Sequence, residues 1–142
     1  MRSLLDVNVL IALLDQGHVH HAAARTWLEA NIGHGWASSS ITQNGCIRIM
    51  SQPAYPGALP PAQVADRLRA AAATPHHAFW PDDVSLLQVD SLSWASILGA
   101  RQITDAYLLA LAVRNDGRFV TFDRTTPLAA VAGAAARHLV VL

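Results

Sequence analysis

The sequence contains no lysine, and this absence limits the chemistry that the chain can perform. All ten basic residues are arginines, and nine of the ten acidic residues are aspartates, with Glu29 as the single glutamate. Mechanisms that require a catalytic lysine are therefore excluded.

Cysteine and long hydrophobic runs are also scarce. Cys46 is the single cysteine, so the chain forms no internal disulfide, which is typical of proteins from a reducing cytoplasm. An apolar stretch such as residues 7–14 is shorter than the roughly 20 residues that a membrane span needs. Asp6 interrupts the first apolar run, so the layout of a signal peptide is missing. We expect a cytoplasmic protein with no membrane segment.

Charge is low overall. Charged residues make up 14% of the chain and the formal net charge is zero, which predicts little general attraction to nucleic acid. The hydrophobic fraction of 52% is sufficient for a buried core and excludes intrinsic disorder. The 142 residues contain no internal repeat or linker, so we expect a single domain spanning residues 1–142.

Short apolar segments alternate with helical patterns along the whole chain. This alternation predicts an α/β fold, with a parallel sheet wrapped by helices. The predicted strands cover residues 3–5, 35–37, 77–80, 118–122 and 139–142. The predicted helices cover residues 7–14, 21–32, 40–50, 60–73, a short segment after 83, 105–114 and 128–136.

Three aspartates occupy equivalent positions in this pattern. Asp6 and Asp123 each end a predicted strand, and Asp105 starts the helix before the second of these strands. Because functional sites of parallel sheets lie beyond the carboxyl ends of the strands, we expect the three carboxylates to converge there. A hard cation such as Mg²⁺ or Mn²⁺ would offset their repulsion and could activate water beside a phosphate. The pattern therefore indicates metal-assisted phosphodiester hydrolysis.

Each aspartate also has a structural interpretation. Asp105 could favour its helix N-terminus electrostatically, and Asp123 could be a turn residue. Asp6 is harder to explain in this way, because it lies between apolar runs, where an unpaired buried carboxylate is costly.

Three segments resemble the motifs of PIN-domain ribonucleases, and their order and spacing resemble the VapC toxins of toxin–antitoxin pairs. The segments are residues 4–10 (Leu-Leu-Asp-Val-Asn-Val-Leu), 104–112 (Thr-Asp-Ala-Tyr-Leu-Leu-Ala-Leu-Ala) and 120–124 (Val-Thr-Phe-Asp-Arg). The resemblance implies a three-layer α/β/α sandwich, a Mg²⁺ or Mn²⁺ site and endonucleolytic cleavage of RNA. It further implies a cognate antitoxin and a homodimer.

The same resemblance assigns roles to individual residues. Asp6 and Asp105 would be the chief metal ligands, and Asp123 would complete the cluster directly or through water. Asn8 would orient Asp6, and Thr121 would hydrogen-bond a carboxylate at the edge of the cluster.

One position departs from the family pattern. The family usually has a glutamate in the helix after its second strand, and the matching residue here is Gln43. An amide carries no negative charge, so the metal site would be weaker. A catalytically impaired module that binds RNA or protein is therefore an alternative function. Arg124 is a candidate for contacting the phosphate of the substrate, and Arg48 could contact phosphate or be structural.

Other interpretations are less favoured. A Rossmann-like phosphohydrolase or a receiver domain is disfavoured because both need a lysine. His18, His20 and His21 lack the second pair of ligands that a structural zinc site shows, so we expect them to open the second helix. Asp82 and Asp83 are expected to cap the short helix that follows them, although one of them could supplement the acidic cluster.

Overall fold

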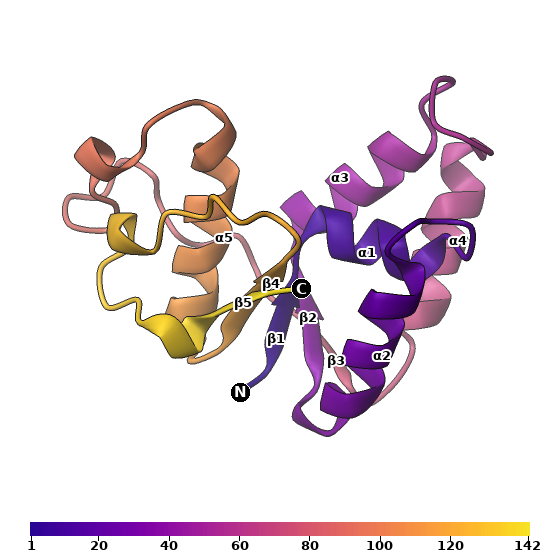
Figure 1. The fold of residues 1–142 in the computed structure, drawn as a ribbon, viewed down its shortest axis with the longest axis horizontal. Helices are drawn as coiled ribbons and strands as arrows, with labels where there is room; N and C mark the ends of the chain where they lie inside the picture. The colour runs from indigo at the N-terminus through magenta and orange to yellow at the C-terminus, as the bar shows by residue number, and fades with distance from the viewer.

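The computed structural model describes all 142 residues and contains one five-stranded sheet (Figure 1). The strand order is β3-β2-β1-β4-β5, and every neighbouring pair is parallel. The parallel α/β fold predicted from the sequence is thus confirmed. The strands are β1 (Ser3–Leu5), β2 (Trp36–Ser38), β3 (His77–Phe79), β4 (Arg118–Thr121) and β5 (Leu139–Val141).

Helices cover both faces of the sheet, which gives the three layers of an α/β/α sandwich (Figure 1). Alternate residues of the central strands face opposite layers: Leu5 and Val120 pack on the side of the first four helices, and Leu4 and Phe119 on the side of the fifth. None of the helices is long and apolar enough to cross a bilayer. The helices are α1 (Val7–Leu14), α2 (His21–Asn31), α3 (Ser40–Met50), α4 (Pro61–Ala72) and α5 (Arg101–Arg114).

The centre of the sheet is where the connectivity changes direction. From β1 the chain proceeds to β2 and β3 on one side and later to β4 and β5 on the other. The backbone N–H of Asp6 donates to the carbonyl of Val120 at 2.9 Å, so the ends of β1 and β4 lie side by side. Open parallel sheets bind their ligands at such a switch point.

Helix α5 is buried over eight consecutive residues, Asp105 to Ala112. A helix that is apolar on every side must be enclosed by other elements. The sheet covers one side of α5, and the side chains of Val84, Ile97 and Leu128 pack against the same core cluster from outside the sheet.

Helix α5 begins at Arg101, four residues before the predicted start. Asp105 therefore lies in the second turn of α5, and Thr104 is inside the helix and does not cap it. Strand β4 ends at Thr121, one residue before the predicted end.

Two predicted helices are wrong. The segment after Asp83 forms turns and only a short 3₁₀ helix at Trp94–Ser96. Residues 128–136 form no α-helix, and two 3₁₀ turns, Leu128–Ala130 and Ala136–His138, occupy this part of the chain. Gly133 lies between them with a φ of 77°, a left-handed backbone conformation that is incompatible with a continuous α-helix.

Candidate active site

Asp6 connects β1 to α1 and caps the N-terminus of that helix. Its Oδ1 accepts a hydrogen bond from the backbone N–H of Val7 at 2.7 Å, and its Oδ2 accepts one from the hydroxyl of Thr121 at 2.6 Å. Only 6% of Asp6 is exposed. Burial raises the pKa of Asp6, and the nearby charge of Asp123 acts in the same direction, while the hydrogen bond from Thr121 opposes both.

The hydroxyl of Thr121 is the centre of a small hydrogen-bond network. Besides donating to Asp6, it accepts hydrogen bonds from Nδ2 of Asn8 at 3.3 Å and from the backbone N–H of Asp123 at 3.0 Å. Oδ1 of Asn8 accepts from the backbone N–H of Phe122 at 3.3 Å. The start of α1 and the end of β4 are thereby held together around Asp6.

Asp105 reaches the same edge from α5. The hydroxyl of Thr126 donates to its Oδ2 at 3.4 Å, and only 8% of Asp105 is exposed. Burial raises the pKa of Asp105 to about 7, with additional contributions from the negative charges of Asp6 and Asp123. The charges of Asp6 and Asp123 both act on Asp105, so the three carboxylates lie near one another.

Asp123 has a different environment from the two buried aspartates. Its Oδ1 accepts hydrogen bonds from both the backbone N–H and the hydroxyl of Thr125, each at 2.7 Å. These hydrogen bonds, together with the positive charge of Arg101, lower the pKa of Asp123. Asp123 therefore remains ionised under conditions where Asp105 is partly protonated.

The oxygen atoms at this edge of the sheet are suitable ligands for a divalent cation, but their number is small. Carboxylate oxygens are the ligands that Mg²⁺ and Mn²⁺ prefer, and no ion pair of the structure includes Asp6 or Asp105. However, no group of three or more His, Cys, Asp or Glu side chains is gathered closely enough to hold a metal ion. Asp6 and Asp105 are the buried carboxylates that could hold a cation, and Asp123, which is close enough to raise the pKa of both, could complete the site.

Gln43 is bonded away from the three aspartates. Its Nε2 donates to Oγ of Ser38 at 3.0 Å, and the same Oγ lies 2.9 Å from Nε2 of His77. The residue of α3 that approaches the start of α1 is Gly45: a Cβ there would lie 2.6 Å from Cγ2 of Val7, the residue after Asp6. Gln43 therefore bonds to Ser38 at the end of β2 and has no hydrogen bond to the candidate site.

The sequence patterns did not identify three further residues that lie near the site. Thr125 and Thr126 follow Asp123 closely, and an aspartate side chain commonly accepts a hydrogen bond from the backbone N–H two residues further on. Arg101 precedes Asp105 by four residues, a spacing that places both on one face of a helix. Its positive charge is close enough to affect Asp123.

The other predicted basic residues project into solvent. Arg124 and Arg48 are exposed, and no ion pair of the structure includes either. Both are free to contact a substrate.

Asp82 and Asp83 lie at the start of the segment where no helix forms. Oδ2 of Asp82 accepts a hydrogen bond from the backbone N–H of Ile41 at 3.0 Å, so Asp82 caps the start of α3, an earlier helix. Asp83 forms an ion pair with Arg114 of α5. These contacts occupy both aspartates away from the acidic cluster.

The histidines have structural contacts as well. Nδ1 of His21 donates to the carbonyl of Ala12 at 2.7 Å, which joins the first turn of α2 to α1.

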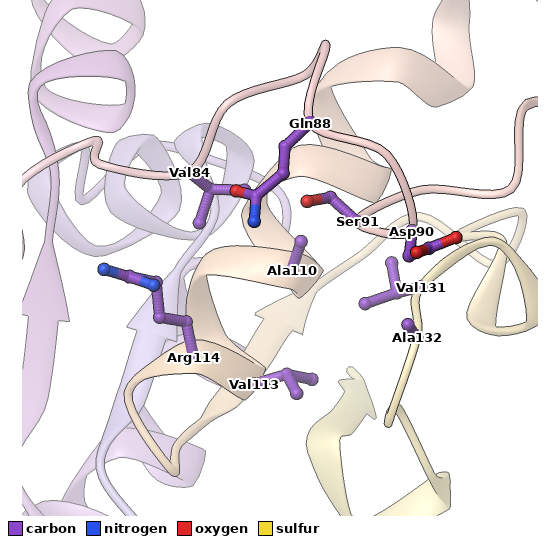
Figure 2. Close-up of a pocket in the computed structure, with 9 residues that line it drawn as sticks. All are labelled: Val84, Gln88, Asp90, Ser91, Ala110, Val113, Arg114, Val131 and Ala132. Atoms are coloured by element: carbon purple, nitrogen blue, oxygen red, sulfur yellow. The ribbon is translucent and has the colours of Figure 1, made fainter.

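A cavity of about 420 Å³ lies between α5 and the segment that follows Asp83. Figure 2 shows Arg114 on α5 and Gln88 and Asp90 on that segment around this cavity. None of the three site aspartates lines it. This hollow is therefore separate from the candidate site.

Comparison with known protein families shows which family has this fold and these motifs. A model of the PIN domain matches residues 3–134. The chain belongs to the PIN domain family. This PIN domain protein is 51% identical to Ribonuclease VapC44 of Mycobacterium tuberculosis over 142 residues, covering 100% of both chains. It is 43% identical to Ribonuclease VapC39 of the same species over 134 residues, which cover 94% of this chain and 96% of the relative.

Two solved structures share its fold at low sequence identity. VapBC2 from Rickettsia felis, bound to a DNA fragment from its promoter, superposes with a TM-score of 0.59 at 14% identity, covering 87% of this chain and 89% of the other. VapC20 of Mycobacterium tuberculosis, described as a toxin that cleaves the sarcin-ricin loop, superposes with a TM-score of 0.54 at 12% identity, covering 82% and 85%. The PIN fold expected from the three motifs is confirmed.

Proposed function

We propose that this PIN domain protein is a divalent-metal-dependent endoribonuclease of the VapC type. The observation that carries the proposal is the pair of buried aspartates, Asp6 and Asp105, at one edge of the sheet with no cationic side chain to neutralise them. The names of the relatives, Ribonuclease VapC44 and Ribonuclease VapC39, support an activity on RNA.

The residues of the site have distinct roles in this proposal. Asp6 and Asp105 would hold Mg²⁺ or Mn²⁺, which when bound would acidify water and offset negative charge on the phosphate. Thr121 keeps the carboxylate of Asp6 in one orientation, and Asn8 keeps Thr121 in place. Asp123, whose hydrogen bonds to Thr125 lower its pKa, stays ionised and would orient the attacking water through its carboxylate.

The basic residues around the site contact the RNA backbone. Arg101, whose charge acts on Asp123, and Arg124, the next residue after Asp123, are both exposed, and a guanidinium binds phosphate through two hydrogen bonds. Arg48, exposed on α3, is a more distant contact of the same kind.

The test is RNA cleavage by the purified chain without its partner. Cellular RNA is incubated with Mg²⁺ or Mn²⁺, and the new RNA ends are sequenced. We expect defined cleavage sites that disappear in Asp6→Asn and Asp105→Asn. Asp66→Asn is the matched control, because Asp66 is an exposed aspartate paired with Arg69 on α4. A protein that cuts no RNA with either ion would overturn the proposal.

We also propose that the chain is the toxin of a toxin–antitoxin pair, neutralised by a cognate antitoxin protein. A solved VapBC2 assembly among the structures with this fold supports the idea. Expression of the chain alone is expected to inhibit translation and arrest growth, and co-expression of a small neighbouring gene is expected to restore growth. Harmless expression would contradict the toxin role. The homodimer and the cytoplasmic location stay predictions, which sedimentation and cell fractionation would check.

One observation favours a second candidate, a PIN module that binds RNA or protein without cutting it. The structure gathers no group of three metal-ligating side chains, and Gln43 adds no charge to the site. Binding of RNA without cleavage, unchanged in Asp105→Asn, would favour this alternative over the ribonuclease.

A further inference from the structure

Two aromatic rings stack on each other directly beside the candidate site. The rings of His20 and Phe122 have centroids 4.6 Å apart and planes 24° apart. Phe122 lies between Thr121 and Asp123, and its backbone N–H donates to Oδ1 of Asn8 at 3.3 Å. The stack is therefore anchored to the same network that holds Asp6 in place.

The loop that carries His20 is held in position by its own hydrogen bonds. The backbone N–H of His20 donates to Nδ1 of His18 at 3.1 Å, and the backbone N–H of His18 donates to the carbonyl of Asp15 at 3.0 Å. The carboxylate of Asp15 accepts hydrogen bonds from the backbone N–H of Gly17 at 3.0 Å and from the hydroxyl of Tyr55 at 2.5 Å. These bonds fix the position of His20 although the residue is exposed.

The ring of His20 is exposed although it lies on Phe122, which the core already partly buries. A third ring, that of His18, has its centroid 5.7 Å from that of His20 at a tilt of 45°, so three aromatic rings are neighbours at this position. Aromatic surfaces of this kind bind the faces of unpaired nucleobases.

We infer that His20 and Phe122 form a stacking platform for one base of a single-stranded RNA, next to the phosphodiester that the site would cleave. The inference rests on the proposed ribonuclease function and names a positioning contact for its substrate. Every base presents a π-face, so the platform would favour unpaired nucleotides without distinguishing one base from another. Because the net charge of the chain is zero, stacking also supplies affinity that general electrostatic attraction does not.

The experiment measures RNA binding in the full chain carrying Asp105→Asn, so that the probe stays intact. The probe is a short, labelled, single-stranded RNA of mixed sequence, together with a series in which one base at a time is removed to leave the bare ribose. Affinity is measured by fluorescence anisotropy in the presence of Mg²⁺. We expect that removing the base at one position lowers the affinity about tenfold.

Substitutions at His20 then assign this loss to the platform. We expect that His20→Ala lowers affinity for the intact RNA about tenfold and no longer responds to removal of that base. His20→Phe keeps both the affinity and the response, because phenylalanine retains the stacking face. Val19→Ala is the matched control, since Val19 is the neighbouring residue, is 85% exposed and is not aromatic.

The outcomes separate this inference from the proposed function. Equal binding by His20→Ala and Val19→Ala, or no probe position whose effect depends on His20, would overturn the platform, whether or not the unsubstituted chain cleaves RNA. Binding that depends on His20 in a chain that never cleaves RNA would support the platform and overturn the ribonuclease. If His20→Ala does not fold, His20→Phe provides the test. A loss of affinity when that base is removed would support the platform, and no loss would overturn it.

Discussion

The hydroxyl of Thr121 donates a 2.6 Å hydrogen bond to Oδ2 of Asp6, although 115 positions of sequence separate the two residues. Both are buried, Thr121 completely. The bond joins the ends of the two central strands, β1 and β4, and fixes the direction of a carboxylate that has no cationic partner. A hydrogen bond to a buried ionised group is among the stronger ones in proteins.

Thr121→Val tests this relationship, because valine has nearly the same shape and lacks the hydroxyl. We expect the affinity for Mg²⁺ or Mn²⁺ to fall about 10- to 100-fold, as is typical when a partner that orients a metal ligand is removed. We also expect a loss of about 1–3 kcal/mol in the free energy of unfolding. Titration calorimetry and urea denaturation measure the two effects. Thr104→Val, at an exposed position on α5, is the control, and equal metal affinity in both variants would contradict the prediction.

The raised pKa of Asp105 predicts how stability depends on pH in metal-free protein. In the folded chain this carboxyl titrates near pH 7, whereas its ordinary value is 3.8. Between these values the folded state retains a proton that the unfolded chain has released, so stability falls as pH rises from about 4 to about 7. The loss amounts to at most about 4 kcal/mol, since one pKa unit corresponds to about 1.36 kcal/mol. The raised pKa of Asp6 acts in the same direction.

Asp105→Asn removes this titration, so we expect its unfolding free energy to change less with pH over the same range. Urea denaturation of both proteins in a chelator, at several pH values, measures the difference. Added Mg²⁺ is expected to stabilise the parent chain at neutral pH and to leave the variant nearly unchanged. Parallel pH profiles for the two proteins would argue against a strongly perturbed Asp105.

Gly45 is required by a close approach between α3 and α1. A Cβ at this position would lie 2.6 Å from Cγ2 of Val7, so we expect Gly45→Ala to destabilise the chain by about 1–3 kcal/mol. Gly33→Ala is the matched control, because nothing lies within 4 Å of the Cβ it would add. Thermal denaturation compares the two variants, and similar melting temperatures would refute the steric explanation.

Arg101 is predicted to contact phosphate at the open side of the site. In the background of Asp105→Asn, we expect Arg101→Gln to weaken binding of single-stranded RNA. The slope of log affinity against log salt concentration is expected to decrease by about 0.7, the value for one phosphate contact. Arg25→Gln is the control, because Arg25 pairs with Glu29 on α2. An unchanged salt slope in Arg101→Gln would exclude the contact.

Local sequence patterns were sufficient to predict the framework of the fold. Short buried runs such as Ser3–Leu5 alternate with helical segments, and each parallel strand delivers its last residue to the same edge. The neighbourhood of Asp6, Asp105 and Asp123 follows from that geometry, as do the effects of their charges on one another. Each strand is defined by a local run of residues, and parallel pairing then brings the strand ends to one edge, which is why the sequence alone indicates these features.

Local patterns failed where contacts between distant segments decide the structure. Residues 128–136 have helical composition, yet Gly133 adopts a left-handed conformation and the segment folds as turns. Asp82 precedes no helix and instead caps α3, whose first residues lie about 40 positions earlier. The neighbouring side chains of Val84, Leu128 and Val131 pack in the core cluster that contains α5.

The sequence by itself determined the order of the elements, the edge of the sheet where the aspartates meet and the absence of lysine chemistry. Only the tertiary structure decided that the carboxylate bonded by Thr121 is that of Asp6, that Asp123 bonds to Thr125, that Gln43 bonds to Ser38 and that His20 stacks on Phe122. The physical reason is that strand and helix periodicity fixes the position of a backbone element. The direction and partner of a polar side chain depend on which atoms the fold places within about 3 Å of it.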